Sequence, residues 1–254
     1  MIFNTYGDET LPSLMLIHGM ANTAQLCYGQ ILPYLDEYQV ILCEVDGHTE
    51  KEQGLFISIR DCCEKIENYV TQNRKGKIYG LSGFSMGGTI GVELMARNNI
   101  EIEKVILDAA FCVKMGMLTP VYTKAFCWAL NRIKTGKTIP GVMIEGVMGK
   151  GNLGIVNTLY KNMETQSIRN ACGDLFRYEI SQTLSDFRGQ VAFWYGGNEY
   201  YPGKTAELLK RHLPQMRVEV LEGMGHGQFL NEHPKEYSGK MKKILYKERS
   251  PSES

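Results

Sequence analysis

Short apolar runs and longer stretches of mixed polarity alternate along most of the chain. Runs of about four to eight apolar residues bounded by turn-forming residues are typical of buried strands. They predict strands at 2–6, 13–17, 39–45, 78–81, 104–107, 190–195 and 217–221. The amphipathic stretches predict helices at 22–35, 55–72, 86–96, 202–213 and 233–246. Repeated strand–helix units imply an α/β fold with a doubly wound, mostly parallel sheet.

The alternation stops between residues 112 and 188. This segment is broken by Gly and Pro and predicts four short helices, at 118–132, 140–148, 152–163 and 165–180. Because strand pattern returns at residue 190, the segment is an insertion. The expected organisation is therefore a core made of 1–111 and 189–254, and a helical cap at 112–188.

Composition narrows the class of partner. Lys plus Arg equals Asp plus Glu, 28 each in 254 residues, so no net field favours nucleic acid or an anionic membrane. No apolar run reaches the about 20 residues that a membrane span requires. The seven cysteines have no metal-site or redox spacing and are expected to be reduced and buried. We expect a cytoplasmic protein that acts on a small molecule.

The first candidate for chemistry is a serine at a strand-to-helix junction. Gly83-Phe84-Ser85-Met86-Gly87 has the form GxSxG, between the strand at 78–81 and the helix that begins near Met86. In this setting GxSxG indicates a nucleophile elbow, in which a strained turn exposes the serine hydroxyl. The helix also directs N–H groups at whatever Ser85 holds.

A serine nucleophile needs a base and a carboxylate that orients the base. His226 lies in a glycine-rich loop after the last predicted strand, and Glu199 follows the strand at 190–195. Both would lie at the same sheet edge as Ser85. Asp108, directly after the strand at 104–107, is the alternative acid.

Together, GFSMGG, the Glu199 loop, GMGHG and the early His18-Gly19 pair resemble the α/β-hydrolase fold superfamily, in particular lid-bearing esterases and monoacylglycerol lipase-like members. The resemblance covers nearly the whole chain. It implies that Ser85 is the nucleophile and His226 the base, and that the backbone N–H groups of Met20 and Met86 form the oxyanion hole. The strand-end acid of this family is usually Asp, whereas this chain has Glu199 there.

Several residues keep two interpretations. Six residues of the insertion either line an acyl pocket or pack on the core: Met115, Met117, Phe126, Trp128, Met143 and Met148. His18 is expected to fix the oxyanion loop by a hydrogen bond, and His48 to be a loop residue.

The sequence therefore predicts a serine hydrolase that cleaves carboxylic esters of small to medium apolar acyl groups through an acyl-enzyme, without a metal or organic cofactor. Thioester, C–C bond, peptide or lyase chemistry on the same fold stays open, and so does a non-catalytic receptor or scaffold. The oligomeric state does not follow from the sequence.

Overall fold

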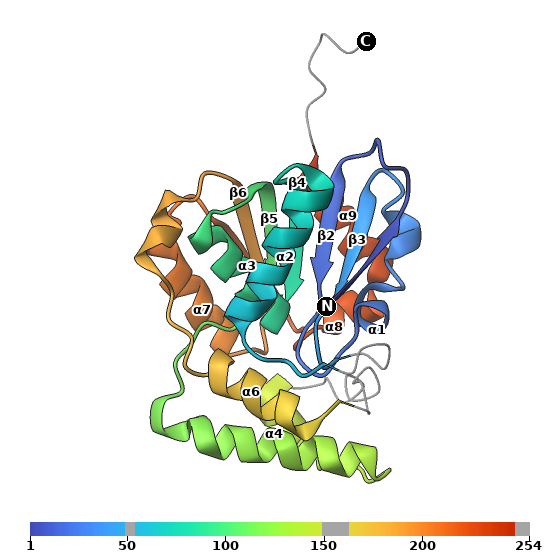
Figure 1. The fold of residues 1–254 in the computed structure, drawn as a ribbon. Helices are drawn as coiled ribbons and strands as arrows, with labels where there is room; N and C mark the ends of the chain where they lie inside the picture. Colours follow the sequence, from blue (N-terminus) through green and yellow to red (C-terminus); the bar gives the residue numbers. More distant parts are fainter. Residues whose placement is uncertain (49–53, 149–162, 247–254) are drawn as a thin grey trace.

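The computed structural model describes residues 1–48, 54–148 and 163–246. Within them, seven strands form one sheet in the order β1-β3-β2-β4-β5-β6-β7 (Figure 1). All neighbouring pairs are parallel except β1 with β3. The predicted mostly parallel α/β sheet is thus confirmed. The strands are β1 (Ile2–Tyr6), β2 (Ser13–Ile17), β3 (Gln39–Glu44), β4 (Lys77–Phe84), β5 (Glu101–Asp108), β6 (Gln190–Gly196) and β7 (Arg217–Leu221).

The central strands carry buried apolar side chains on both faces because both faces of the sheet are covered. In β2, Met15 and Ile17 join one core cluster, and Leu14 and Leu16 join the other. The first cluster includes residues of α2 (Ile59–Arg74), α3 (Met86–Arg97) and α7 (Tyr201–Lys210). The second includes residues of α1 (Ala24–Tyr28), α8 (Gln228–Glu232) and α9 (Pro234–Leu245). The sheet is therefore the middle layer of three.

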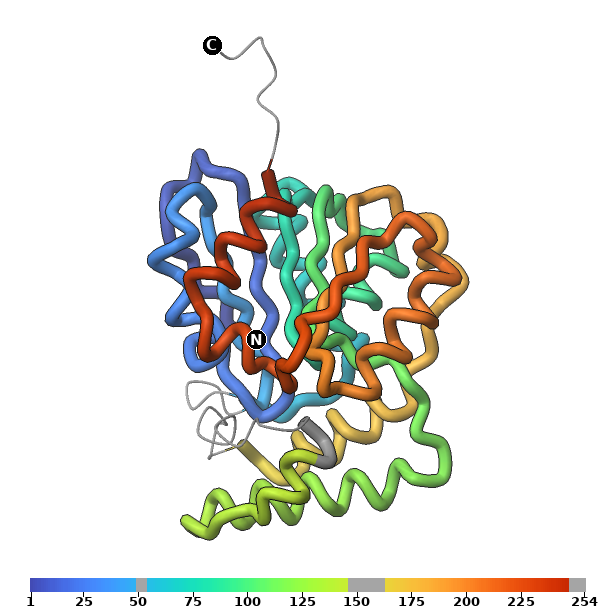
Figure 2. Tube along the Cα trace, turned by 180° about the vertical axis from the view of Figure 1, so that it is seen from behind, coloured from blue at the N-terminus to red at the C-terminus, as the bar shows by residue number. Residues whose placement is uncertain are grey.

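Among the described residues, three helices between β5 and β6 stand outside these layers. They are α4 (Thr119–Lys134), α5 (Gly141–Met148) and α6 (Thr165–Leu175). Helices α4 and α6 lie beyond one end of the sheet, with α6 nearer to the sheet and α4 outermost (Figure 1), and the view from behind shows the same arrangement (Figure 2). The chain returns through a 3₁₀ turn, η4 (Gln182–Asp186), which packs against α3.

Helix α6 is fastened to the segment that precedes α2. Ser167 Oγ accepts a hydrogen bond from Phe56 N–H (3.1 Å), and Asn170 Nδ2 donates to Phe56 O (2.8 Å). One turn further, Asp174 Oδ2 accepts from Ile59 N–H (2.5 Å). These side chains follow one another at i, i+3 and i+7, so they share one helix face. That face holds α6 to the core.

Helix boundaries differ from the expected ones where local capping decides them. The helix expected at 22–35 is split into α1 and a 3₁₀ turn at Leu32–Tyr34, because the chain contains Gly29 at the end of α1 and Pro33 inside the turn. The helix expected from residue 55 begins at Ile59, since Ser58 caps it. The helix expected at 165–180 ends at Leu175, and α8 was not predicted. Most of the helix expected at 152–163 lies outside the described residues.

Candidate functional site

Ser85 occupies the turn between β4 and α3 in a backbone conformation that non-glycine residues rarely adopt. Its φ is 53° and its ψ is −116°. The Ser85 N–H donates to Asp108 O (2.8 Å), and Ser85 O accepts from Thr89 N–H (3.1 Å). These bonds to the neighbouring strand and to the first turn of α3 hold the strained turn in place.

The flanking glycines are required by close backbone packing. A Cβ on Gly83 would lie 2.3 Å from Gly87 O, and a Cβ on Gly87 would lie 2.1 Å from Ile17 O. No side chain fits in either place. The GxSxG spacing therefore lets the start of α3 pack directly on β4 and on the end of β2, with Ser85 at the apex.

The loop after β6 brings a carboxylate to an imidazole. Glu199 Oε2 accepts a hydrogen bond from His226 Nδ1 (2.5 Å), and Glu199 Oε1 accepts one from Gly196 N–H (2.8 Å). The loop after β7 lies alongside, since Asn198 N–H donates to Met224 O (3.0 Å). Both carboxylate oxygens are thus engaged. The structure places Glu199 on His226 Nδ1, which leaves Nε2 as the other nitrogen of the ring.

Asp108, the alternative acid, is buried and is hydrogen-bonded to a different side chain. Its Oδ2 accepts a hydrogen bond from the Tyr237 hydroxyl (2.9 Å). Burial, reinforced by the nearby Glu199 charge, raises the pKa of Asp108 to about 7. Near neutral pH, Asp108 is therefore protonated in part of the molecules.

Opposing effects act on the pKa of His226. Burial lowers it, whereas the Glu199 carboxylate, through its charge and its hydrogen bond, and the Asp108 charge raise it. The raising effects win, so the pKa of His226 lies above the ordinary value of an imidazole. A neutral His226 is a correspondingly stronger proton acceptor.

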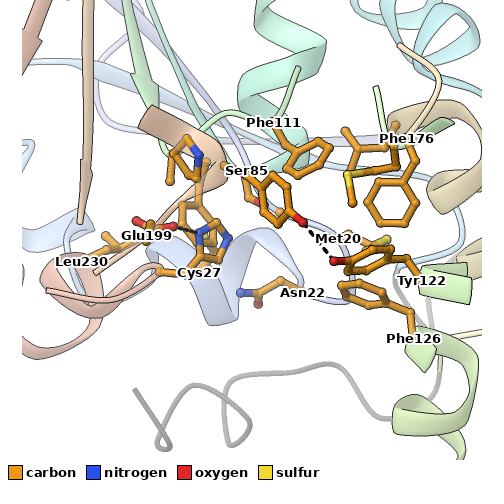
Figure 3. A pocket seen from close by; sticks show the side chains of 18 of the residues that line it. Met20, Asn22, Cys27, Ser85, Phe111, Tyr122, Phe126, Phe176, Glu199 and Leu230 are labelled. Carbon is orange, nitrogen blue, oxygen red and sulfur yellow. Dashed lines mark hydrogen bonds and ion pairs between the residues drawn. The ribbon is translucent and has the colours of Figure 1, made fainter. Parts of the chain in front are cut away.

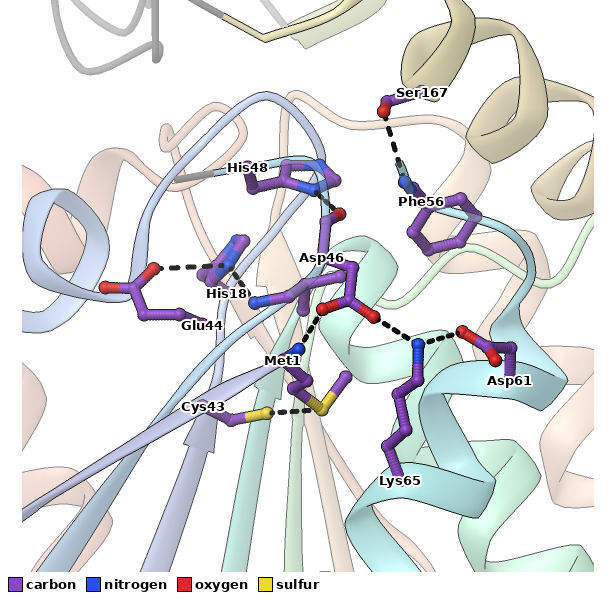
Figure 4. A network of polar contacts seen from close by, with 11 residues as sticks. Met1, His18, Cys43, Glu44, Asp46, His48, Phe56, Asp61, Lys65 and Ser167 are labelled. Atoms are coloured by element: carbon purple, nitrogen blue, oxygen red, sulfur yellow. Dashed lines mark hydrogen bonds and ion pairs between the residues drawn. The ribbon is translucent and has the colours of Figure 1, made fainter. Parts of the chain in front are cut away.

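The loop after β2 is fixed by a neutral, buried histidine (Figure 4). The Val45 N–H donates to His18 Nε2 (3.0 Å), so the ring proton is on Nδ1 and donates to Gly19 O (2.8 Å). Burial lowers the pKa of His18 to about 4. This hydrogen bonding agrees with the expectation that His18 fixes the loop that contains Met20. His48, whose ring lies 5.2 Å from that of His18, is also buried and donates from Nδ1 to Asp46 O (2.9 Å).

Ser85, His226, Glu199 and Met20 all line one pocket. Figure 3 shows Ser85 between two groups of side chains, with Glu199 and Leu230 on one side and a cluster of aromatic rings on the other. Met86 is fully buried, and as the first residue of α3 it has an N–H without an acceptor inside the helix. The apolar wall comes from the core and from α4 and α6, and includes Phe111, Met115, Tyr122, Phe126, Leu175, Phe176 and Tyr201.

Trp128 and Met143 are not among the residues that line this pocket. Each is 40% exposed, and the Trp128 ring lies 5.0 Å from the Arg132 guanidinium. Successive residues in an α-helix are about 100° apart, so Trp128 lies about 200° from Phe126 on α4. Tyr122 and Phe126, at i and i+4, share the pocket side of that helix. Their spacing is the signal by which Tyr122 could have been found.

Among the described residues, no group of three or more His, Cys, Asp and Glu side chains is arranged to hold a metal ion. None of the helices in these residues is long and apolar enough to span a bilayer.

Comparison with curated protein sequences finds no match. Among solved structures, an alpha/beta hydrolase family protein from Desulfitobacterium hafniense superposes with a TM-score of 0.85 at 24% identity, over 96% of this chain and 100% of that one. A carboxylesterase structure from the thaumarchaeon Nitrososphaera gargenis gives 0.75 at 16% identity, over 94% and 92%. The enol-lactonase from Burkholderia xenovorans LB400 gives 0.76 at 14% identity, over 96% and 95%. At these identities the likeness concerns the fold alone.

A sequence comparison with family models agrees with the fold. The model of the alpha/beta hydrolase fold matches residues 12–139, which include the His18 loop and the Ser85 turn. This match covers half of the chain. The chain therefore belongs to the alpha/beta hydrolase fold family.

Proposed function

We propose that the protein is a serine hydrolase that cleaves carboxylic esters of small to medium apolar acyl groups. The observation that supports this most is the 2.5 Å hydrogen bond between His226 Nδ1 and Glu199, in the pocket that also contains Ser85. A carboxylate on Nδ1 fixes the imidazole tautomer with Nε2 unprotonated, as a general base requires. Ser85, His226 and Glu199 are then nucleophile, base and acid.

The proposed reaction has two halves. His226 Nε2 takes the Ser85 hydroxyl proton while Oγ forms a bond to the ester carbonyl carbon. The resulting oxyanion accepts hydrogen bonds from the Met20 and Met86 N–H groups. The imidazolium, stabilised by Glu199, gives its proton to the leaving alkoxide oxygen as the C–O bond breaks, which leaves an acyl-enzyme. Water then attacks the acyl carbon, His226 takes the water proton, and this proton returns to Ser85 as the acid is released.

The residues that line the pocket favour an apolar acyl group in the substrate. Its aromatic side is formed by rings from the core and from α4 and α6, and no Lys or Arg is among its described lining residues. We assign residues 112–188 as a cap over a core of 1–111 and 189–254. The carboxylesterase and enol-lactonase names of two structural neighbours agree with ester chemistry. The seven cysteines, all of them free thiols, support a reducing, cytoplasmic location.

Labelling by a fluorophosphonate probe tests this function without knowledge of the substrate. We expect the wild-type protein to be labelled, and Ser85→Ala to lose both labelling and p-nitrophenyl ester turnover by several orders of magnitude. Ser82→Ala, at a buried serine of β4, is the control and should still be labelled. If Ser85→Ala kept more than about a tenth of kcat/KM, a cost below about 1.4 kcal/mol, Ser85 would not be the nucleophile.

A further inference from the structure

Two tyrosine hydroxyls meet in the aromatic part of the pocket. Tyr122, on α4, and Tyr201, the first residue of α7, are joined by a hydrogen bond of 2.9 Å between their hydroxyl oxygens (Figure 3). Both side chains are partly buried, and both line the pocket that contains Ser85. The bond links the outermost helix to the core within the substrate pocket.

The rings around this tyrosine pair are apolar. The Phe111 ring centre lies 5.4 Å from that of Tyr201, and the Phe176 ring centre lies 5.9 Å from that of Tyr122. Phe111 and Phe176 are themselves 5.5 Å apart, and Phe126 lies 6.0 Å from Phe176. The two hydroxyl groups are therefore the polar part of an otherwise aromatic wall.

The tyrosine pair has one hydrogen more than it uses. Each phenol carries one hydroxyl hydrogen, and a single hydrogen bond between them consumes one of the two. Among the described residues, the second hydroxyl hydrogen has no acceptor. Burial and the bond to Tyr122 raise the pKa of Tyr201 to about 12, so the Tyr201 hydroxyl stays protonated at neutral pH. A hydroxyl that accepts one hydrogen bond also donates a stronger one.

We propose that this second hydroxyl hydrogen binds an oxygen atom of the substrate's acyl chain, so that the substrates are esters of short acyl groups that contain a neutral oxygen acceptor. This inference rests on the proposed function. The absence of Lys and Arg from the described lining, together with the Glu199 carboxylate in the same pocket, favours an ether, hydroxyl or carbonyl oxygen over a second carboxylate. The aromatic rings contact the apolar part of the acyl chain, and the hydrogen bond from the tyrosine pair fixes how far the chain extends into the pocket.

The test uses substrates of equal length that differ in one atom. The p-nitrophenyl esters of 4-methoxybutanoic and 3-ethoxypropanoic acid each replace one methylene of the hexanoate ester by oxygen. For each ether ester we measure kcat/KM relative to that of the hexanoate ester. In the double variant Tyr122→Phe/Tyr201→Phe, this ratio should fall about 3- to 10-fold for at least one ether, as expected for the loss of one neutral hydrogen bond. Because the comparison is between proteins, differences in the intrinsic reactivity of the esters cancel.

Tyr200→Phe is the matched control. Tyr200 adjoins the pair in sequence, is 65% exposed and does not line the pocket, so its substitution should leave the ratio at the wild-type value. If the double variant does not fold, the two single variants decide, and at least one must lower the ratio.

An unchanged ratio for both ethers would overturn the inference. An equal fall of kcat/KM for all three esters also leaves the ratio unchanged, and would mean that the tyrosine pair only holds α4 against the core. Fluorophosphonate labelling of the same samples separates this from failure of the proposed function. A labelled enzyme with an unchanged ratio refutes the tyrosine site alone, whereas a wild-type protein that is neither labelled nor active refutes both.

Discussion

Replacing Glu199 by glutamine should disable the imidazole while leaving the shape of the loop intact. The carboxylate of Glu199 accepts two hydrogen bonds, from Gly196 N–H (2.8 Å) and from His226 Nδ1 (2.5 Å). A glutamine has one carbonyl oxygen, so it can serve one of these donors. If the oxygen stays with Gly196, the amide NH₂ faces Nδ1 and favours the tautomer with the proton on Nε2, which cannot take the Ser85 proton. If the amide is rotated by about 180°, its NH₂ faces the Gly196 N–H, and two donors cannot bond to each other.

The imidazolium formed during the reaction also loses its counter-charge. Both effects act on the same step, and we expect kcat for p-nitrophenyl butanoate to fall as far as about 10⁴-fold. Asp108→Asn is the matched control, because the asparagine oxygen can still accept from Tyr237, and its loss should stay under about 10-fold. Equal melting temperatures would show that neither change acts through the fold. A loss under about 10-fold in Glu199→Gln, or a reversed order of the two variants, would refute the assignment of Glu199.

Two further outcomes follow from the geometry. His226 must be neutral to act as the base, so kcat/KM should rise with pH, with its midpoint above the ordinary imidazole pKa. Because the Asp108 charge raises the pKa of His226, Asp108→Asn should move this rise to lower pH. A pH–rate profile in which the rise is unmoved, or moved to higher pH, would contradict the coupling. Gly87→Ala would place a Cβ 2.1 Å from a backbone oxygen and should destabilise the fold by about 1–3 kcal/mol in denaturant unfolding, whereas Gly173→Ala, where a Cβ meets nothing within 4 Å, should be neutral or stabilising by up to about 1 kcal/mol.

The sheet could be predicted from sequence because its determinants are local. The run Ser13–Ile17 is apolar at nearly every position, which is the pattern that a strand buried on both faces requires. The candidate triad could be predicted for a related reason. Parallel strands place their following loops at one edge, so residues far apart in sequence, such as Ser85 and His226, meet wherever the strand ends are correctly located.

The aromatic side of the pocket could not be predicted in the same way. Which face of α4 turns inward depends on its packing against α6, and that contact is not encoded in either helix alone. Of the two aromatic candidates on α4, Phe126 lines the pocket and Trp128 is 40% exposed, whereas Tyr122, which also lines the pocket, was not a candidate. Tyr201 was also missed, since nothing in its own sequence neighbourhood indicates a partner 79 residues away.

The hydrogen bonds that hold α4 and α6 are separate from those that hold the Glu199–His226 pair. Helix α6 is tied to the core by hydrogen bonds of Ser167, Asn170 and Asp174, whereas α4 packs on α6 and bonds to Tyr201 through the Tyr122 hydroxyl. None of these bonds involves Glu199 or the loop that holds it. Substitutions on the pocket side of α4 should therefore reshape the aromatic side of the pocket while the hydrogen bonds of Glu199 to His226 and to Gly196 are kept, because neither bond involves α4. Under the proposed function, substitutions at Tyr122 of α4 and Tyr201 of α7 should change substrate preference while the turn at Ser85 is kept.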